Sequence, residues 1–147
     1  MSRMRTHAKE TAALPAEQAL LNAPPEEYMS PAQLAFFRQR LLAMREALLA
    51  NADATSEQLK KAEAVADTSD RATLEEEYTL ELRTRDRERK LLHKIDAALR
   101  RIEDGSYGYC EDTGEPIGIA RLLARPTATL SIEAQERRER RERVYGG

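Results

Sequence analysis

Mostly apolar residues recur at intervals of three, four or seven between residues 34 and 66. This spacing places the apolar side chains on one narrow stripe of an α-helix. The stripe is narrower than the apolar face of an ordinary globular helix, so it favours pairing with a second helix. Its members are Leu34, Phe37, Leu41, Met44, Leu48, Thr55, Leu59, Ala62 and Ala66.

The start of this helix is marked by three consecutive signals. Ser30 can cap the first turn, Pro31 suits the first helical position, and Gln33 can reach back as a capping-box partner. At 1.5 Å per residue, a helix over 34–66 would be about 50 Å long.

A second helix is predicted to begin near Asp70, where the acidic residues 75–77 suit a helix N-terminus. It should end at Gly105, a residue that favours helix termination. Its centre, 83–90, is almost wholly charged. The apolar stripe that matches the first helix consists of Leu74, Tyr78, Leu82, Leu92, Ile95, Leu99 and Ile102.

Only the short segment 67–70 separates the two helices, so they must run antiparallel. We therefore predict a mainly α protein, a long antiparallel coiled-coil hairpin on a small globular base, with at most a trace of β structure near 107–120. The expected organisation is an N-terminal segment in the base (1–32), the hairpin (33–104, tip at 67–72), a degenerate zinc-finger-like segment (105–134) and a C-terminal helix (135–147).

Composition narrows the function. The chain has 147 residues, a net charge of −2 and one cysteine. A slightly acidic chain is not expected to bind nucleic acid by neutralising phosphates, and a single cysteine excludes an internal disulfide framework. No apolar run has the length of a signal peptide or a membrane span. We therefore expect a cytoplasmic protein.

Four positions in the segment 107–136 have the spacing of a four-cysteine zinc site, but only one of them is a cysteine. They are Cys110, Thr113, Ser131 and Ala134. Zinc requires thiolate, imidazole or carboxylate ligands, so we predict that no metal is held here. Instead Ser131 should cap the last helix, with Glu133 in its first turn. A small apolar core would consist of Ile117, Ile119, Leu122, Leu123, Leu130 and Ile132.

Cys110 has two interpretations. It is either a small buried residue left at the ancestral site or a reactive thiol. No cluster of cations flanks it, and Glu111 and Asp112 are expected to raise its pKa. The sequence favours the buried residue.

Three stretches carry a specific resemblance: "DTSDRA", "EYTLELRTRDRERKL" and "GIARLLARPTA". They resemble the DksA/TraR family of bacterial RNA polymerase-binding transcription factors, and the resemblance runs from about residue 26 to 143. The zinc cysteines of the family would fall at the four positions named above. The chain therefore looks like a variant that lacks three of the four zinc-ligand cysteines.

The resemblance implies that the hairpin enters the secondary channel of RNA polymerase. Asp67, Asp70 and Ala72 match the family's tip residues, which act near the polymerase active site without doing chemistry, so the protein is not expected to be an enzyme. Without the resemblance, the two aspartates would be interpreted as simple helix caps.

The resemblance also implies an effector. Arg87, Leu91 and Lys94 lie on one helical face, and with Arg125 they match residues that bind ppGpp together with polymerase; otherwise they form an ordinary solvated face. The family often has a basic residue where this chain has Gln135. The implied function is to cooperate with ppGpp, to inhibit stable-RNA promoters and to activate others, without zinc.

Three alternatives remain at this stage. The protein could bind the secondary channel independently of ppGpp or in the manner of the Gre factors. It could be a thiol-based redox-responsive regulator acting through Cys110, or a purely structural coiled coil. We expect a monomer that makes no sequence-specific DNA contact and does not bind membranes.

Overall fold

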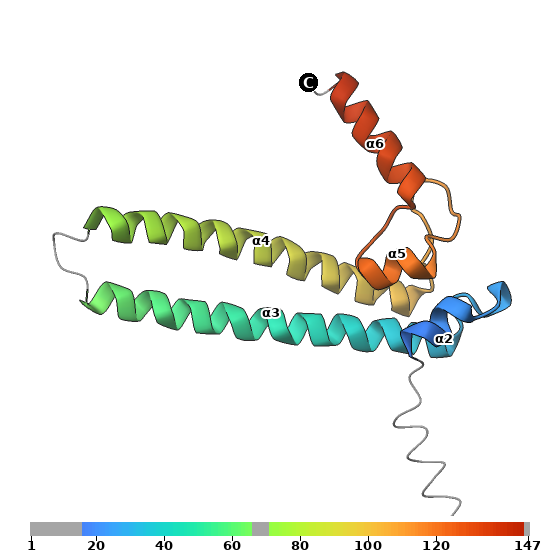
Figure 1. Ribbon diagram of the computed structural model, residues 1–147, viewed down its shortest axis with the longest axis horizontal. Coiled ribbons are helices and arrows are strands. Elements are labelled where there is room, and N and C mark those ends of the chain that lie inside the picture. Colours follow the sequence, from blue (N-terminus) through green and yellow to red (C-terminus); the bar gives the residue numbers. More distant parts are fainter. Residues whose placement is uncertain (1–15, 66–70, 146–147) are drawn as a thin grey trace, which may run out of the picture. The chain divides into compact units, whose positions relative to one another are not determined.

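The computed structural model describes residues 16–65 and 71–145, and these are predominantly helical (Figure 1). Across these ranges there is no strand, and the only β feature is an isolated antiparallel bridge between Tyr109 and Pro116. The predicted mainly α fold is confirmed. The elements are α2 (Glu17–Asn22), the 3₁₀ helix η1 (Pro25–Glu27), α3 (Pro31–Val65), α4 (Arg71–Asp104), α5 (Ile119–Ala124) and α6 (Ile132–Tyr145).

The chain divides into two compact units. The hairpin unit is Leu42–Ala97, and the base unit combines the described residues of Met1–Leu41 and Ala98–Gly147. None of the described helices has the length and apolarity needed to cross a membrane.

The predicted cap of α3 forms with one difference. The Gln33 backbone N–H donates to Ser30 Oγ (3.4 Å), but the Gln33 side chain accepts from the N–H of Met29 (2.9 Å) and not from that of Ser30. The Ser30 N–H is already donated to the carbonyl of Glu27 (2.9 Å). Gln33 is buried, so this cap ties the start of α3 into the base unit.

The end of α4 follows the prediction. Gly105 adopts the left-handed φ of 86°, a conformation that glycine takes without steric cost. The N–H groups of Gly105, Ser106 and Tyr107 all donate to the carbonyl of Arg101, at 3.0, 3.0 and 3.1 Å. These bonds satisfy a carbonyl that would otherwise lack a partner and stop the helix.

In the hairpin unit, α3 and α4 run side by side in opposite directions (Figure 1). Their facing stripes are partly or fully buried, and Arg45 on α3 pairs with Asp96 on α4 (Nε–Oδ1 2.9 Å). The apolar residues that line this contact are Met44, Leu48 and Leu59 from α3 and Leu74, Leu92 and Ile95 from α4.

The centre of the contact is polar, which corrects the predicted stripe. Glu81, Arg85 and Glu88 continue the heptad frame of Leu74 and Leu92, whereas the predicted members Tyr78 and Leu82 are 41% and 52% exposed. Arg85 donates to Ser56 Oγ on α3 (2.7 Å) and to Glu81 Oε1 (3.2 Å). A long charged side chain can bury its aliphatic stem in such a contact. The charged residues of α4 therefore gave no sign in the sequence that they belong to the heptad frame.

The base unit is built around aromatic rings. Phe37 packs against Phe36 and Tyr107, with ring centroids 5.3 and 5.6 Å apart. The Tyr107 hydroxyl donates to the carbonyl of Pro126 (2.7 Å), and burial raises the pKa of Tyr107. Of the predicted core, Ile117, Leu122 and Leu130 are buried, but Ile132 is 50% exposed because it faces outward from the first turn of α6.

Tyr28 ties the N-terminal part of the base unit to the finger-like segment. Its hydroxyl donates to the carbonyl of Gly108 (2.5 Å) and accepts from the N–H of Gly118 (3.0 Å). Gly108 has a φ of 90°, and a Cβ there would lie 2.7 Å from Met29 Sδ. The close approach of these segments therefore requires glycine at this position.

Candidate functional sites

The predicted tip is described only in part. Asp67 and Asp70 lie outside the described residues. Ala72 lies in the first turn of α4 and is exposed.

The predicted effector residues fall in both units. Arg87, Leu91 and Lys94 are exposed on one face of α4 in the hairpin unit, outside the contact with α3. Arg87 makes a long hydrogen bond to Thr84 Oγ1 (3.5 Å). Arg125 follows α5 in the base unit and is also exposed.

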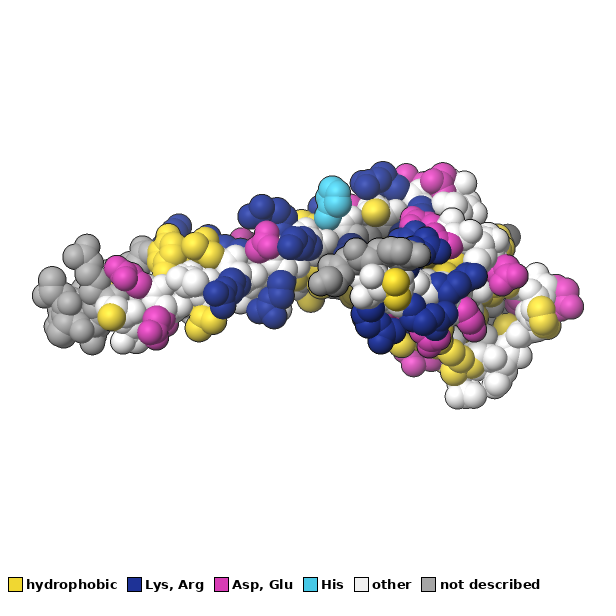
Figure 2. Space-filling model, turned by 90° about the horizontal axis from the view of Figure 1, so that it is seen from above, with side chains coloured by type: hydrophobic (Ala, Val, Ile, Leu, Met, Phe, Trp, Pro, Cys, Tyr) yellow, Lys and Arg dark blue, Asp and Glu magenta, His cyan; other side chains and the backbone are white. Residues whose placement is uncertain are grey.

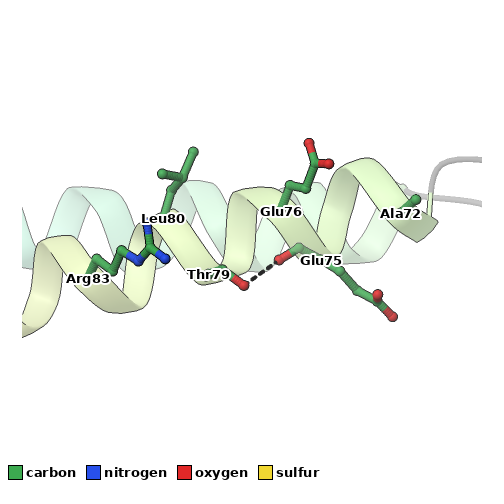
Figure 3. A pocket seen from close by; sticks show the side chains of 6 residues that line it. All are labelled: Ala72, Glu75, Glu76, Thr79, Leu80 and Arg83. Carbon is green, nitrogen blue, oxygen red and sulfur yellow. Dashed lines mark hydrogen bonds between the residues drawn. The ribbon is translucent and has the colours of Figure 1, made fainter.

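The sequence interpretation missed the continuation of this face toward the start of α4. Figure 3 shows a shallow open depression there, lined by Ala72, Glu75, Glu76, Thr79, Leu80 and Arg83. Leu80 is 60% exposed. The signal was available, because Leu80 and Arg83 stand at helical intervals from Arg87 and Leu91.

The four positions with zinc-site spacing do come together in the base unit. Cys110 is 3% exposed, and its sulfur interacts with the Thr113 hydroxyl and the Ser131 N–H. Ser131 Oγ accepts from the Ala134 N–H (3.2 Å), which confirms the predicted cap of α6. Ala134 is completely buried. We call these residues the ligand-poor finger site: Cys110, Thr113, Ser131 and Ala134.

The pKa of Cys110 moves in the direction opposite to the prediction. Burial raises the pKa of this thiol, but hydrogen bonds from the Thr113 hydroxyl and from the N–H groups of Ser131, Thr113 and Asp112 outweigh burial and lower it to about 6. The two neighbouring carboxylates are occupied by arginines, since Glu111 pairs with Arg101 (3.5 Å) and Asp112 with Arg138.

This donor set does not fit a structural zinc ion. One thiol is present, the Ser131 hydroxyl is used to cap α6, and Ala134 has no donor atom. Among residues 16–65 and 71–145, no three His, Cys, Asp or Glu side chains lie close enough to hold a metal.

Hydrogen bonds and an ion pair hold the finger site together. The Cys110 N–H donates to the carbonyl of Glu115 and the Gly114 N–H to that of Cys110, both at 2.8 Å. Arg138 on α6 donates to both carboxylate oxygens of Asp112, from Nε to Oδ2 (3.1 Å) and from Nη2 to Oδ1 (2.5 Å). The first turns of α6 are thereby attached to the turn that carries Cys110 and Thr113.

This protein combines an antiparallel helical hairpin with a finger-like loop. These two features define its class as that of helical-hairpin proteins with a zinc-ribbon-like element. Comparison with known families places this chain more closely. Residues 33–102 match the family described as "DnaK suppressor protein DksA, N-terminal domain", and residues 105–140 match the "Prokaryotic dksA/traR C4-type zinc finger".

Individual relatives of this chain support the same family assignment. The chain is 62% identical over 121 residues to the RNA polymerase-binding transcription factor DksA of Caulobacter vibrioides, covering 82% of this chain and 85% of that protein. It is 50% identical over 125 residues to the protein of the same name from Escherichia coli, covering 84% and 83%. The solved structure of transcription factor DksA2 from Pseudomonas aeruginosa superposes with a TM-score of 0.81 at 52% identity, covering 87% and 99%.

The chain therefore belongs to the DksA family, as the sequence motifs predicted. Members of this family are transcription factors and not enzymes. Within the family's C4-type finger, this chain keeps one of the four cysteines.

Proposed function

We propose that this protein regulates transcription by binding bacterial RNA polymerase. The observation that carries the proposal is the 62% identity to an RNA polymerase-binding transcription factor over 82% of the chain. The hairpin and the finger segments also match the two DksA family descriptions separately, over residues 33–102 and 105–140.

We propose that the hairpin enters the secondary channel of the polymerase. The 35 residues of α3 and the 34 of α4 give helices about 50 Å long. A pair of helices of this length is slender enough to occupy a narrow passage. Asp67, Asp70 and Ala72 would then act beside the polymerase active site and shorten the lifetime of sensitive promoter complexes by electrostatics and contact, with no reaction of their own.

The effector in this proposal is ppGpp, bound between the protein and polymerase. Arg87, Lys94 and Arg125 supply cations for its phosphates, and Leu91 supplies an apolar contact. Gln135 offers no charge, and its side chain donates to Glu139 (3.1 Å). Because Arg138 is paired with Asp112, the exposed Arg137 is the residue that compensates.

We also propose that regulation needs no zinc, because the finger site lacks the ligands and is held by hydrogen bonds. The protein would act as a cytoplasmic monomer that makes no sequence-specific contact with DNA. With ppGpp it would inhibit stable-RNA promoters and activate others.

Transcription in vitro from a ribosomal RNA promoter, with and without ppGpp, tests the proposal. Wild type should inhibit, and inhibition should increase with ppGpp. Asp70→Asn should lose inhibition but still bind polymerase, whereas the control Asp86→Asn, on the exposed surface of α4, should behave as wild type. Inhibition by Asp70→Asn equal to wild type would refute the role of the tip. Inhibition that does not respond to ppGpp would favour the ppGpp-independent or Gre-like alternative.

A further inference from the structure

The surface of the hairpin unit carries apolar side chains that the contact between its helices does not bury (Figure 2). Leu80 is 60% exposed, the highest value among the large apolar residues of the described hairpin. Its neighbours along the same face are Glu76 on the side of the tip and Arg83 on the other side, and both are exposed.

These residues belong to one continuous stripe of α4. At about 100° per residue, six exposed side chains fall within an arc of about 80°. The heptad frame of Glu81, Glu88 and Ile95 lies about 100° around the helix from the centre of this arc and faces α3. We call this surface the outer stripe: Glu76, Leu80, Arg83, Arg87, Leu91 and Lys94.

The charges of the outer stripe are segregated. The carboxylate of Glu76 lies at the tip end, with Glu75 beside the stripe, and the cations Arg83, Arg87 and Lys94 occupy the remainder. A surface of this kind complements a partner that presents carboxylates over most of the stripe and an apolar side chain against Leu80. A second copy aligned in the same direction would instead place cations against cations.

We propose that Leu80 and Arg83 form a docking contact with an acidic surface of RNA polymerase, between the tip and the predicted effector residues. The inference rests on the proposed function and adds two residues that fix how the hairpin is held. Leu80 would bury its side chain against an apolar group of the polymerase, and Arg83 would pair with a carboxylate beside it.

The hairpin itself offers matched controls. Leu82 is 52% exposed but lies more than about 100° around the helix from the outer stripe. Arg89 is likewise exposed and off the stripe. Leu80→Gln and Leu82→Gln therefore make the same chemical change on different faces, as do Arg83→Glu and Arg89→Glu.

The experiment measures the affinity of full-length variants for RNA polymerase core enzyme, with circular dichroism melting to verify folding and sedimentation to report self-association. Leu80→Gln and Arg83→Glu should each weaken binding about tenfold or more, and the controls should stay within about twofold.

The outcomes separate the two proposals. If wild type does not bind polymerase, the proposed function fails. If wild type binds and Leu80→Gln loses no more affinity than Leu82→Gln, the docking contact is refuted while the proposed function stands. If wild type sediments as a dimer that Leu80→Gln dissociates, a second copy covers the stripe and the docking contact is likewise refuted.

Discussion

Arg138 of α6 binds Asp112 through two parallel hydrogen bonds, Nε to Oδ2 and Nη2 to Oδ1, beside the ligand-poor finger site. In a four-cysteine finger, a metal joins the two halves of such a segment. Here the same two halves are joined by this ion pair, by the Glu111 N–H, which donates to the carbonyl of Thr129 (2.9 Å), and by the hydrogen bond from the Ser131 N–H to the Cys110 sulfur.

Asp112→Asn should loosen α6. The hydrogen bond from Arg138 holds the pKa of Asp112 below its usual range, so the pair persists at and above the ordinary pKa of an aspartate and is lost only as pH falls through the lowered value. Hydrogen exchange of the α6 amides, corrected for intrinsic rates, should increase in the variant between pH 5 and 7. The control Asp86→Asn removes a pair with Lys90 and should leave α6 unchanged. Equal α6 exchange in wild type and Asp112→Asn would contradict the attachment.

Gly108→Ala should destabilise the base unit by about 2–4 kcal/mol, because it combines a left-handed backbone with a Cβ placed 2.7 Å from Met29 Sδ. Gly114→Ala provides the comparison. That glycine also has a positive φ of 75° but open space around it, so its substitution should cost only about 1–2 kcal/mol. Urea unfolding of both variants measures the difference. An equal loss in the free energy of unfolding in both variants would show that the contact with Met29 does not add to the destabilisation.

The Cys110 thiol should make stability depend on pH. Its pKa is lowered to about 6 in the folded protein, against about 8.5 in an unfolded chain. Its contribution is fully present above the unfolded value and is lost as pH falls toward 6. The free energy of unfolding should therefore increase between pH 6 and 8.5 in wild type but not in Cys110→Ser.

Thr113→Val offers a second test, since it removes the hydroxyl that hydrogen-bonds to the sulfur and should raise the pKa of Cys110. If the free energy of unfolding changes with pH in the same way in wild type and in Cys110→Ser, the prediction that Cys110 is a thiolate in the folded protein is wrong. Transcription assays with Cys110→Ser also decide the redox alternative, which requires that the variant lose its response to oxidants.

Glu88→Leu should stabilise the hairpin unit by about 1 kcal/mol. Glu88 takes a position in the helix contact, and its buried Oε2 has no hydrogen-bond partner among the described residues. A leucine would extend the apolar contact of Leu92. Glu77→Leu, at an exposed position, should change the free energy of unfolding by less than about 0.5 kcal/mol. A loss of stability in Glu88→Leu would mean that the carboxylate is satisfied in solution.

The sequence predicted the helix limits well because local chemistry sets them. Ser30, Gln33 and Gly105 act within a few residues of themselves, and each behaves in the structure nearly as its type indicates. The described members of the α3 stripe were also predicted, since they are apolar or small, whereas Ala66 lies outside the described residues.

The features that the sequence did not predict depend on contacts between residues that are distant in the sequence. Glu81 and Arg85 enter the helix contact because Ser56 on α3 meets them, and this displaced Leu82 to the surface. The pKa of Cys110 is set by N–H groups whose directions follow from the folded loop and the cap of α6.

The lifetime of a complex between RNA polymerase and a ribosomal RNA promoter is the decisive measurement for zinc-independent regulation of transcription by this protein. The protein is prepared in the presence of a zinc chelator, its metal content is measured, and it is added to preformed complexes that are challenged with a competitor. Metal-free protein should shorten the lifetime, and ppGpp should shorten it further. An unchanged lifetime at protein concentrations that saturate polymerase would contradict this prediction.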